Sequence, residues 1–264
     1  MLGILQLRFG LSHFRSEYGL IHLPSQDFVP KLKQHLLPRI QALLSKEEMA
    51  CGRDPLSFNR PEGGLPESST TNEQLERDSV LFKDNRMYKH QLVRINYTTY
   101  DVRRSQDVIN PNTTHRDIML LANTDNEEES SNPRFLYARV LGIYHVNVIY
   151  TGPGMLDYRP RRLEFLWVRH FHHLGDRLVT WGDFSLDQLC FPPMASDDAF
   201  GFIDPNDVLR GSHIIPSFKI GKVHQDEVAL SRCAGDAQDW GRYVVNRCVK
   251  YWPKHLAAHY IFRG

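Results

Sequence analysis

The strongest constraint on the fold of this chain comes from two long apolar segments, 134–150 and 162–171, on either side of a turn rich in Gly, Pro and Arg. In the first segment, every second position from Leu136 to Tyr150 is apolar or glycine. Because a strand directs alternate side chains to opposite faces, this pattern predicts a strand with one face buried in a β core. Gly142 lies midway along it, where a bulge or bend is expected.

Weaker strand signals surround this pair. Further strands are expected near 79–82, 88–97, 117–122 and 212–215. Strands that are long, bent and buried on one face suit a strongly curved arrangement better than a flat sheet. The predicted fold class is therefore α+β, with a curved β-sheet or small β-barrel core and flanking N-terminal and C-terminal helices.

The flanking helices are predicted from apolar residues at helical spacing. Residues 27–50 show this spacing, with Asp27 placed to cap the helix and Pro30 in its first turn. Pro38 lacks the backbone N–H that would bond back one turn, so it should kink or split this helix. Residues 239–252 place their aromatic residues on one helical face and predict the second helix.

Composition divides the chain into four parts. Residues 51–77 are rich in Pro, Gly, Ser and Glu and cannot bury enough apolar surface to offset the entropy of ordering, which predicts a flexible linker. The expected organisation is a helical flank over 1–50, this linker, a β-barrel-like domain over 78–225 and a C-terminal helical flank over 226–264. Within the domain, the acidic stretch 123–133 is expected to form a hairpin tip in water.

The cysteine content favours a reducing compartment. The four cysteines are scattered and form no CxxC pair, unlike the disulfide framework of a secreted domain. The N-terminal stretch lacks a cleavage site of small residues, and no run reaches the roughly 18 apolar residues that a bilayer span needs. We therefore expect a nuclear or cytoplasmic protein with no membrane partner.

Charge is segregated along the chain although the net charge is only +1. Lys and Arg exceed the acids in residues 1–46 and 158–177, whereas residues 178–207 carry Asp and no Lys or Arg. Two interpretations stay open: a basic face for phosphates opposite an acidic one, or ordinary solvated surface.

Histidines form one dense cluster, His170, His172 and His173. Together with Cys190 or His213 they would supply nitrogen and sulfur ligands for zinc. A structural zinc site needs four converging ligands, usually in closely spaced pairs, and a second pair is not visible. Surface or hydrogen-bonded histidines at a strand end are the favoured interpretation.

The acidic pairs Asp197-Asp198 and Asp204/Asp207 raise the alternative of a metal-dependent nuclease or hydrolase. Magnesium sites need carboxylates that converge from separate elements, whereas Asp before a turn or helix is common for capping alone. Neither a nucleophile motif nor a phosphate-binding glycine motif is present. The sequence therefore predicts no enzyme, no catalytic residue, no metal and no cofactor.

Aromatic and basic residues lie close together at two places. Tyr100 precedes Arg103 and Arg104 in the chain. Trp167 and Phe171 lie at the end of the predicted strand 162–171, which also carries arginine. Stacked rings with arginines bind single-stranded nucleic acid, and an aromatic cage binds methyl-lysine. The alternative is that the rings fill the core. The candidate binding set is Tyr100, Arg103, Arg104, Arg161, Arg162, Trp167 and Phe171.

Much of the chain resembles a conserved region of uncharacterised basidiomycete proteins, found in reading frames associated with Plavaka-like transposons. The segments that carry the resemblance are 35–44, 86–122, 134–150, 163–171, 199–218 and 239–252. The string YARVLGIYH, residues 137–145, is the most specific of them. The resemblance implies an association with a mobile element and no assigned activity.

A second resemblance is architectural, to bromo-adjacent homology (BAH) domains, which are β-barrel modules that bind chromatin or protein partners. The strand YARVLGIY and the strand ending at Phe171 stand where that family has two strands of its barrel. The family's acidic RPEET tail is missing, and the segment 208–215 keeps Gly211 without the family's cysteine. The resemblance implies a BAH-like fold and a chromatin partner.

These observations lead to one functional expectation. The chain is expected to be a non-catalytic interaction module of a fungal mobile-element-related protein, with a chromatin protein or nucleic acid as its partner. The alternatives are a metal-dependent nuclease or hydrolase remnant and a purely structural scaffold.

Overall fold

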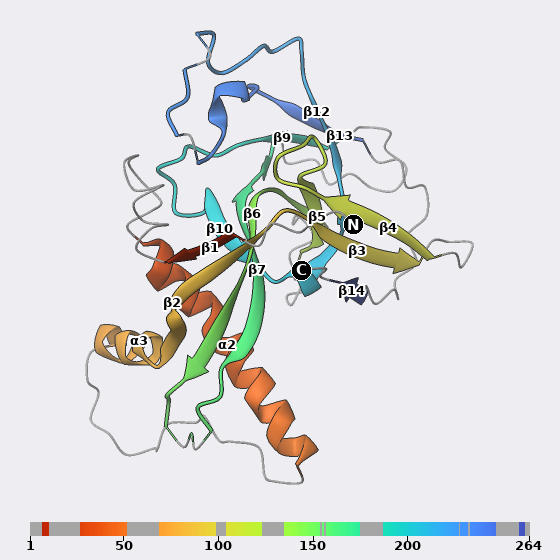
Figure 1. The fold of residues 1–264 in the computed structure, drawn as a ribbon. Helices are drawn as coiled ribbons and strands as arrows, with labels where there is room; N and C mark the ends of the chain where they lie inside the picture. Colours follow the sequence, from red (N-terminus) through yellow and green to blue (C-terminus); the bar gives the residue numbers. More distant parts are fainter. Residues whose placement is uncertain are drawn as a thin grey trace, which may run out of the picture.

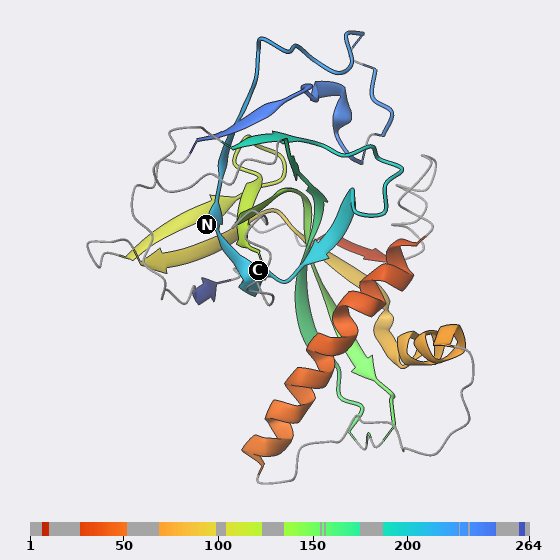
Figure 2. The same cartoon turned by 180° about the vertical axis from the view of Figure 1, so that it is seen from behind.

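The computed structural model describes residues 7–10, 27–51, 69–98, 104–122, 135–153, 155, 157–174, 187–226, 228–231, 233–246 and 259–261. Within them, the strands form three antiparallel sheets, with a long helix against one face of the largest (Figures 1 and 2). The elements in chain order are β1 (Leu7–Gly10), α2 (Phe28–Ala50), α3 (Ser69–Asp78), β2 (Val80–His90), β3 (Val93–Thr98), β4 (Arg104–Ile109), β5 (Asp117–Leu121), β6 (Phe135–Tyr150), β7 (Arg161–His170), β8 (His172–His173), β9 (Gln188–Cys190), β10 (Phe200–Ile203), η1 (Pro205–Asp207), β11 (Val208–Gly211), β12 (His213–Pro216), η2 (Asp236–Gln238), β13 (Tyr243–Asn246) and β14 (His259–Ile261).

The largest sheet is built around β6. This strand pairs with β7 on one side, while on the other side its first part pairs with β5 and its second part with β2. The two strands predicted over 134–150 and 162–171 are confirmed. The register of β6 against β7 shifts between Val140 and Gly142, which confirms the expected irregularity at this glycine.

The shift at Gly142 exchanges the faces of β6. Val140 and Ile143 pack in one core with β3, β5 and β11, whereas Tyr144 and Val146 pack in another core beneath α2. Leu136, at the start of the alternating pattern, is 43% exposed. The predicted burial of every second position is confirmed from Ala138 to Tyr150, but these positions line two cores and not one face, because an extra residue in a strand reverses the alternation beyond it.

Helix α2 covers one face of β2, β6 and β7 (Figure 2). Its residues Leu32, Leu36, Ile40 and Leu44 are no more than 1% exposed and lie four residues apart, as expected for one helix face. The predicted helix is confirmed. It continues through Pro38 as a single helix, so the predicted split does not occur, and Pro38 lies on its exposed side.

The described strands of the β region do not close into a barrel. Among the described residues, the sheets are β1-β2-β6-β5-β11 with β7 and β10 added beside β6, β12-β13-β9-β8, and β14-β3-β4, and all three are open. The barrel alternative was therefore wrong, while the broader α+β class is shown. Strands β11 and β12 are neighbours in the chain but pair with β5 and β13, so the chain leaves one sheet to begin another.

Two other predictions need correction. Part of the expected linker, Ser69–Asp78, is helix α3, and the expected C-terminal helix is replaced over Tyr243–Asn246 by strand β13. The side chain of Asp27 makes no capping hydrogen bond to α2. The expected hairpin tip at 123–133 lies outside the described residues. No helix in the described part of the chain is long and apolar enough to cross a bilayer.

Candidate interaction surface

The segment between β12 and β13 extends away from the sheets, at the top of Figure 1. Its backbone is held by hydrogen bonds to the residues just before β13. The Val223 N–H donates to the Asp239 carbonyl over 2.9 Å, and the Gly241 N–H donates to the Gly221 carbonyl over 3.0 Å. The two ends of the segment therefore run side by side and extend the β12–β13 pairing outward.

Large apolar side chains on this segment face solvent. Single exposed apolar residues are normal on proteins, whereas a group of them along one segment is a candidate contact surface. The group, referred to below as the apolar loop surface, consists of Ile215 of β12 (37% exposed) and, on the segment after it, Phe218 (72%), Ile220 (50%), Val223 (56%), Val228 (59%) and Leu230 (66%).

The first half of this surface rests on Trp240 and Gly241. The Phe218 ring meets the Trp240 ring edge to face, with centroids 5.1 Å apart. A Cβ atom at Gly241 would lie 2.8 Å from Cγ2 of Ile220, so only glycine leaves room for this side chain. Phe218 and Ile220 therefore each contact a neighbouring residue of the segment, although half or more of each residue is exposed.

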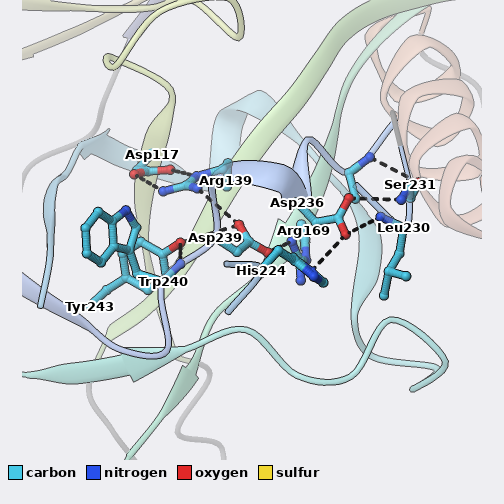
Figure 3. Close-up of polar contacts among 11 residues, drawn as sticks. Asp117, Arg139, Arg169, His224, Leu230, Ser231, Asp236, Asp239, Trp240 and Tyr243 are labelled. Carbon is cyan, nitrogen blue, oxygen red and sulfur yellow. Dashed lines mark hydrogen bonds and ion pairs between the residues drawn. The ribbon is translucent and has the colours of Figure 1, made fainter. Parts of the chain in front are cut away.

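The second half is organised by the carboxylate of Asp236, which is 1% exposed. It accepts hydrogen bonds from the backbone N–H groups of Leu230 and Ser231, both at 2.9 Å, and Nε2 of His224 lies 3.3 Å from it (Figure 3). The buried Asp236 side chain thus contacts three residues of the segment, and one of these contacts holds the backbone of Leu230 in place.

Asp239 joins this segment to the central sheet through buried ion pairs, and a further buried ion pair between two strands of the sheet lies beside it (Figure 3). Arg139 on β6 donates to both oxygens of Asp117 on β5, over 2.8 and 3.1 Å. Arg169 on β7 donates to Asp239 of the segment over 2.5 Å, and Nη1 of Arg139 lies 3.9 Å from the same carboxylate. Burial raises the pKa of Asp239, whereas for Arg139 the lowering by burial is outweighed by Asp117, and its pKa is raised.

Aromatic rings enclose both guanidinium groups. The Arg169 guanidinium lies 3.9 Å from the centroid of Phe191 and that of Arg139 lies 5.0 Å from the same centroid. Phe171 and Tyr243 are each 5.3 Å from the Arg139 guanidinium. These cations are removed from water, and their carboxylate partners and the ring faces replace part of the lost hydration, since Nε of Arg169 is buried without a hydrogen-bond partner.

The structure places the two predicted binding rings in cores. Trp167 is 5% exposed and packs against Phe28 of α2, whereas Phe171 is 4% exposed and belongs to the core beside the ion pairs. Neither ring presents a face to solvent, which agrees with the alternative that the aromatic residues fill the core. Tyr100 and Arg103 lie outside the described residues.

The predicted arginines are not brought together. Arg161 bonds to Glu47 of α2 over 2.7 Å, and Arg162 bonds to Glu164 over 2.8 Å, so carboxylates already neutralise both. Arg104 is exposed at the start of β4, on the β3–β4 hairpin. The start of β7, which carries the other two, is at a different end of the molecule (Figure 1).

The predicted histidine cluster makes local contacts. His172 Nε2 lies 2.8 Å from Asp198, and His173 Nε2 lies 3.0 Å from the Phe135 carbonyl. Burial lowers the pKa of His170. Within the part of the chain that the structure describes, no three His, Cys, Asp or Glu side chains converge as a metal site.

Cys190 lies opposite His172 in the β8–β9 pair, and His172 contacts Asp198, so a Cys, a His and an Asp are neighbours. A nucleophilic cysteine needs a lowered thiol pKa, because the thiolate is the reactive form. Burial instead raises the pKa of Cys190. The arrangement does not supply a resting thiolate.

Asp204 and Asp207 lie at the two ends of the short helix η1, and Asp204 also contacts helix α2. Asp204 accepts a hydrogen bond from the backbone N–H of Asn206 over 2.9 Å and pairs with Arg39 of α2 at 2.6 Å. Burial and the nearby Asp204 raise the pKa of Asp207. Arg39 also donates to the Glu164 carbonyl on β7 over 2.7 Å. The contacts of Arg39 with Asp204 and Glu164 therefore hold α2 against the sheet.

Sequence reasoning missed the apolar loop surface. In the sequence, its residues alternate irregularly with Lys, Gly and Asp and show neither a strand nor a helix period. Whether such residues are buried depends in part on contacts distant in sequence, here that of Asp239 with Arg169. The one sequence signal for this surface was a stretch of apolar residues that has neither a strand nor a helix periodicity.

Comparison with known proteins found no matching family model, no matching curated protein and no matching solved structure. A function for this chain is therefore inferred from its own side chains and surfaces.

Proposed function

We propose that this chain is a non-catalytic interaction module that binds a protein partner through the apolar loop surface. The observation that supports this proposal is the exposure of Phe218, Leu230 and four other large apolar side chains on β12 and the segment after it. Contact with a partner removes this apolar area from water, which is the main favourable term in most protein association.

The fixed base of the segment supports the same proposal. The ion pair between Arg169 and Asp239 and the bonds from Asp236 hold the backbone before any partner arrives. Ordering a mobile loop on binding costs free energy, and a prearranged loop avoids most of this cost. The apolar side chains are therefore presented in a defined arrangement.

A protein partner is favoured over nucleic acid. Binding to phosphates needs unpaired Lys and Arg side chains, and Arg161 and Arg162 are held by carboxylates. The resemblance to transposon-linked fungal frames and to BAH domains supports a chromatin-associated protein as the partner. In this proposal the module acts in the nucleus as part of a mobile-element-related protein.

Selection of peptides from a random display library tests the proposal. The wild-type chain is expected to enrich peptides with apolar anchors, and the Phe218→Asp and Leu230→Asp variants are expected to lose them. Leu75→Asp on α3 is the matched control, because Leu75 is 62% exposed and lies outside the apolar loop surface. Equal binding by the wild-type chain and both surface variants would contradict the proposal.

A DNA titration tests the competing interpretation. Fluorescence anisotropy with duplex and single-stranded DNA at two salt concentrations is expected to show no tight binding. Tight binding that weakens steeply with salt, and that is lost on replacement of Arg103, Arg104, Arg161 and Arg162 by Ala, would establish a nucleic-acid module instead.

A further inference from the structure

We infer that the buried pair of His90 and His145 is an acid-sensitive contact whose loss releases the end of β2 from β6. The released part consists of the last four residues of β2 and is referred to below as segment 87–90. The histidine pair lies on β2 and β6 and not on the segment that carries the apolar loop surface, so its role is independent of what that surface binds.

One hydrogen bond joins the two rings. Nε2 of His90 and Nδ1 of His145 are 2.7 Å apart, and the Tyr88 ring stacks on that of His145 with centroids 4.6 Å apart. One of the two facing nitrogens donates a proton and the other accepts it, so one of them must be deprotonated. When both rings are protonated, the pair has no acceptor and two like charges meet in a buried contact.

The charged groups that face the pair do not favour its protonated form. Glu164 of β7 lies opposite His145 in the strand register, but its carboxylate is bonded to Arg162 over 2.8 Å. Burial, and after it the charge of Arg162, lowers the pKa of both histidines. On β2, Tyr88 adds a ring face and no carboxylate. Within the described part of the chain, these flanking strands therefore present no unpaired carboxylate to the histidine pair.

Segment 87–90 is attached to β6 by a short stretch of pairing. Its four residues pair with β6 beyond a register shift that separates them from the first half of β2. Between the two halves, Asp84 and Asn85 have φ values of 57° and 50°, the backbone of a tight turn. After His90 the chain leaves this sheet, because the next strand, β3, pairs with β4 and β14.

Burial holds this segment at two of its positions. Met87 and His90 are at most 3% exposed, whereas Tyr88 and Lys89 are partly exposed. On its other side the segment pairs with β1, a strand of four residues. Segments with few buried apolar side chains open at a lower free energy than the whole protein unfolds. Met87 and the histidine pair are thus the buried contacts of this segment, and acid removes one of them.

Release of the segment changes the position of β6 in the sheet. Residues 143–146 of β6 pair with segment 87–90 on one side and with β7 on the other. Without the segment they form an edge, with unpaired backbone groups that a further strand can bind. The histidine pair therefore controls whether this part of β6 is internal to the sheet or open at its edge.

The open population should rise as pH falls, because the open segment binds protons that the closed one does not. An exposed imidazole has a pKa of about 6.5, whereas burial lowers the pKa of His145 in the folded protein to about 3. Between pH 7 and 5, each histidine that becomes exposed raises the open population by up to roughly 25-fold, and both together raise it by up to roughly 600-fold.

Hydrogen exchange of the wild-type chain at pH 7 and pH 5, corrected for the intrinsic exchange rate, tests the inference. At pH 5 the amides of segment 87–90 should exchange at least about tenfold faster than those of residues 36–40 in α2. Acid also favours global unfolding, since burial lowers the pKa of His35 and His170. Low denaturant concentrations separate the two events, because local opening exposes less surface and depends less on denaturant. Equal protection and equal denaturant dependence of both segments overturn the inference.

The His145→Gln variant tests the role of the pair. Gln keeps a hydrogen-bonding side chain but does not titrate, so the rise in opening of segment 87–90 between pH 7 and 5 should shrink by up to roughly 25-fold. His115→Gln is the matched control, because His115 is exposed in the turn between β4 and β5, and it should respond to pH as the wild-type chain does. Near-ultraviolet circular dichroism at pH 7 establishes that each variant is folded. A full wild-type response to pH in His145→Gln overturns the inference.

Discussion

Arg169 and Asp239 form a buried ion pair, with Nη1 and Oδ2 2.5 Å apart and both side chains at most 6% exposed. Arg169 belongs to the central strand β7, and Asp239 belongs to the segment that carries the apolar loop surface. The pair therefore links the rigid core of the protein to the surface proposed to bind a partner. Removal of this ion pair should lower the stability of the folded protein and loosen the segment between β12 and β13.

The Asp239→Asn variant is expected to lose about 3–5 kcal/mol of unfolding free energy, because it leaves the Arg169 cation buried without a carboxylate. Chemical denaturation measures this loss. Asp226→Asn, an exposed acid of the same segment, is the control and should change stability by less than about 0.5 kcal/mol. Equal effects of the two substitutions would show that the buried pair does not stabilise the fold.

Acid should destabilise the folded state through buried histidines. His90 Nε2 and His145 Nδ1 are 2.7 Å apart, and both residues are at most 4% exposed. Burial, with Arg162 nearby, lowers the pKa of His145 from 6.5 to about 3, and burial lowers the pKa of His90. Below pH 6.5 the unfolded chain binds protons that the folded chain does not, so stability falls as pH falls toward the folded pKa values.

The measurement for this prediction is the unfolding free energy at several pH values between 7 and 4, for the wild-type chain and for His145→Gln. Removal of one such group should lower the slope by up to about 1.4 kcal/mol per pH unit. NMR of the imidazole nitrogens should show His145 neutral in the folded protein at pH 5. A protonated ring under those conditions would refute the assignment.

Gly142 should not tolerate a side chain. A Cβ atom there would lie 2.3 Å from Cε2 of Tyr144, whose ring is buried. We expect Gly142→Ala to cost about 1–3 kcal/mol, because the ring has no free space to move into. In a Tyr144→Leu background the same substitution should cost less, and a double-mutant cycle measures the difference. Additive effects would place the cost in the backbone and not in the ring contact.

The apolar loop surface should contribute little to stability. Leu230→Ser is expected to change the unfolding free energy by less than about 0.5 kcal/mol, since Leu230 is 66% exposed. Leu36→Ala, in the buried face of α2, should cost about 2–5 kcal/mol. Thermal and chemical denaturation compare the two. A large loss for Leu230→Ser would mean that this residue serves the fold and not a partner.

Local pattern was sufficient to predict much of the fold. The spacing of Leu32, Leu36, Ile40 and Leu44 predicted helix α2, and the apolar runs predicted β6 and β7. These elements are long, and their patterns repeat often enough to identify the period. Gly142 also marked the irregularity correctly, but the sequence did not show that the residues on either side of it enter different cores.

The errors occurred where contacts distant in sequence decide the structure. Tyr243 and Val244 fit a helical face with Trp240, yet strand β13 forms because its backbone pairs with β12 and β9. The polar helix α3 lacks the apolar stripe by which helices are recognised. Trp167 and Phe171 are aromatic residues near arginines whether buried or exposed, so sequence proximity did not distinguish a binding cage from a core.

Hydrogen exchange with and without a selected peptide tests the central claim most directly. If a protein partner binds the apolar loop surface, the backbone amides around Phe218 and Leu230 should gain protection when the peptide is added, while those of β6 and β7 stay unchanged. Protection that appears elsewhere, or no change in the β12–β13 segment when the peptide is bound, would contradict the account.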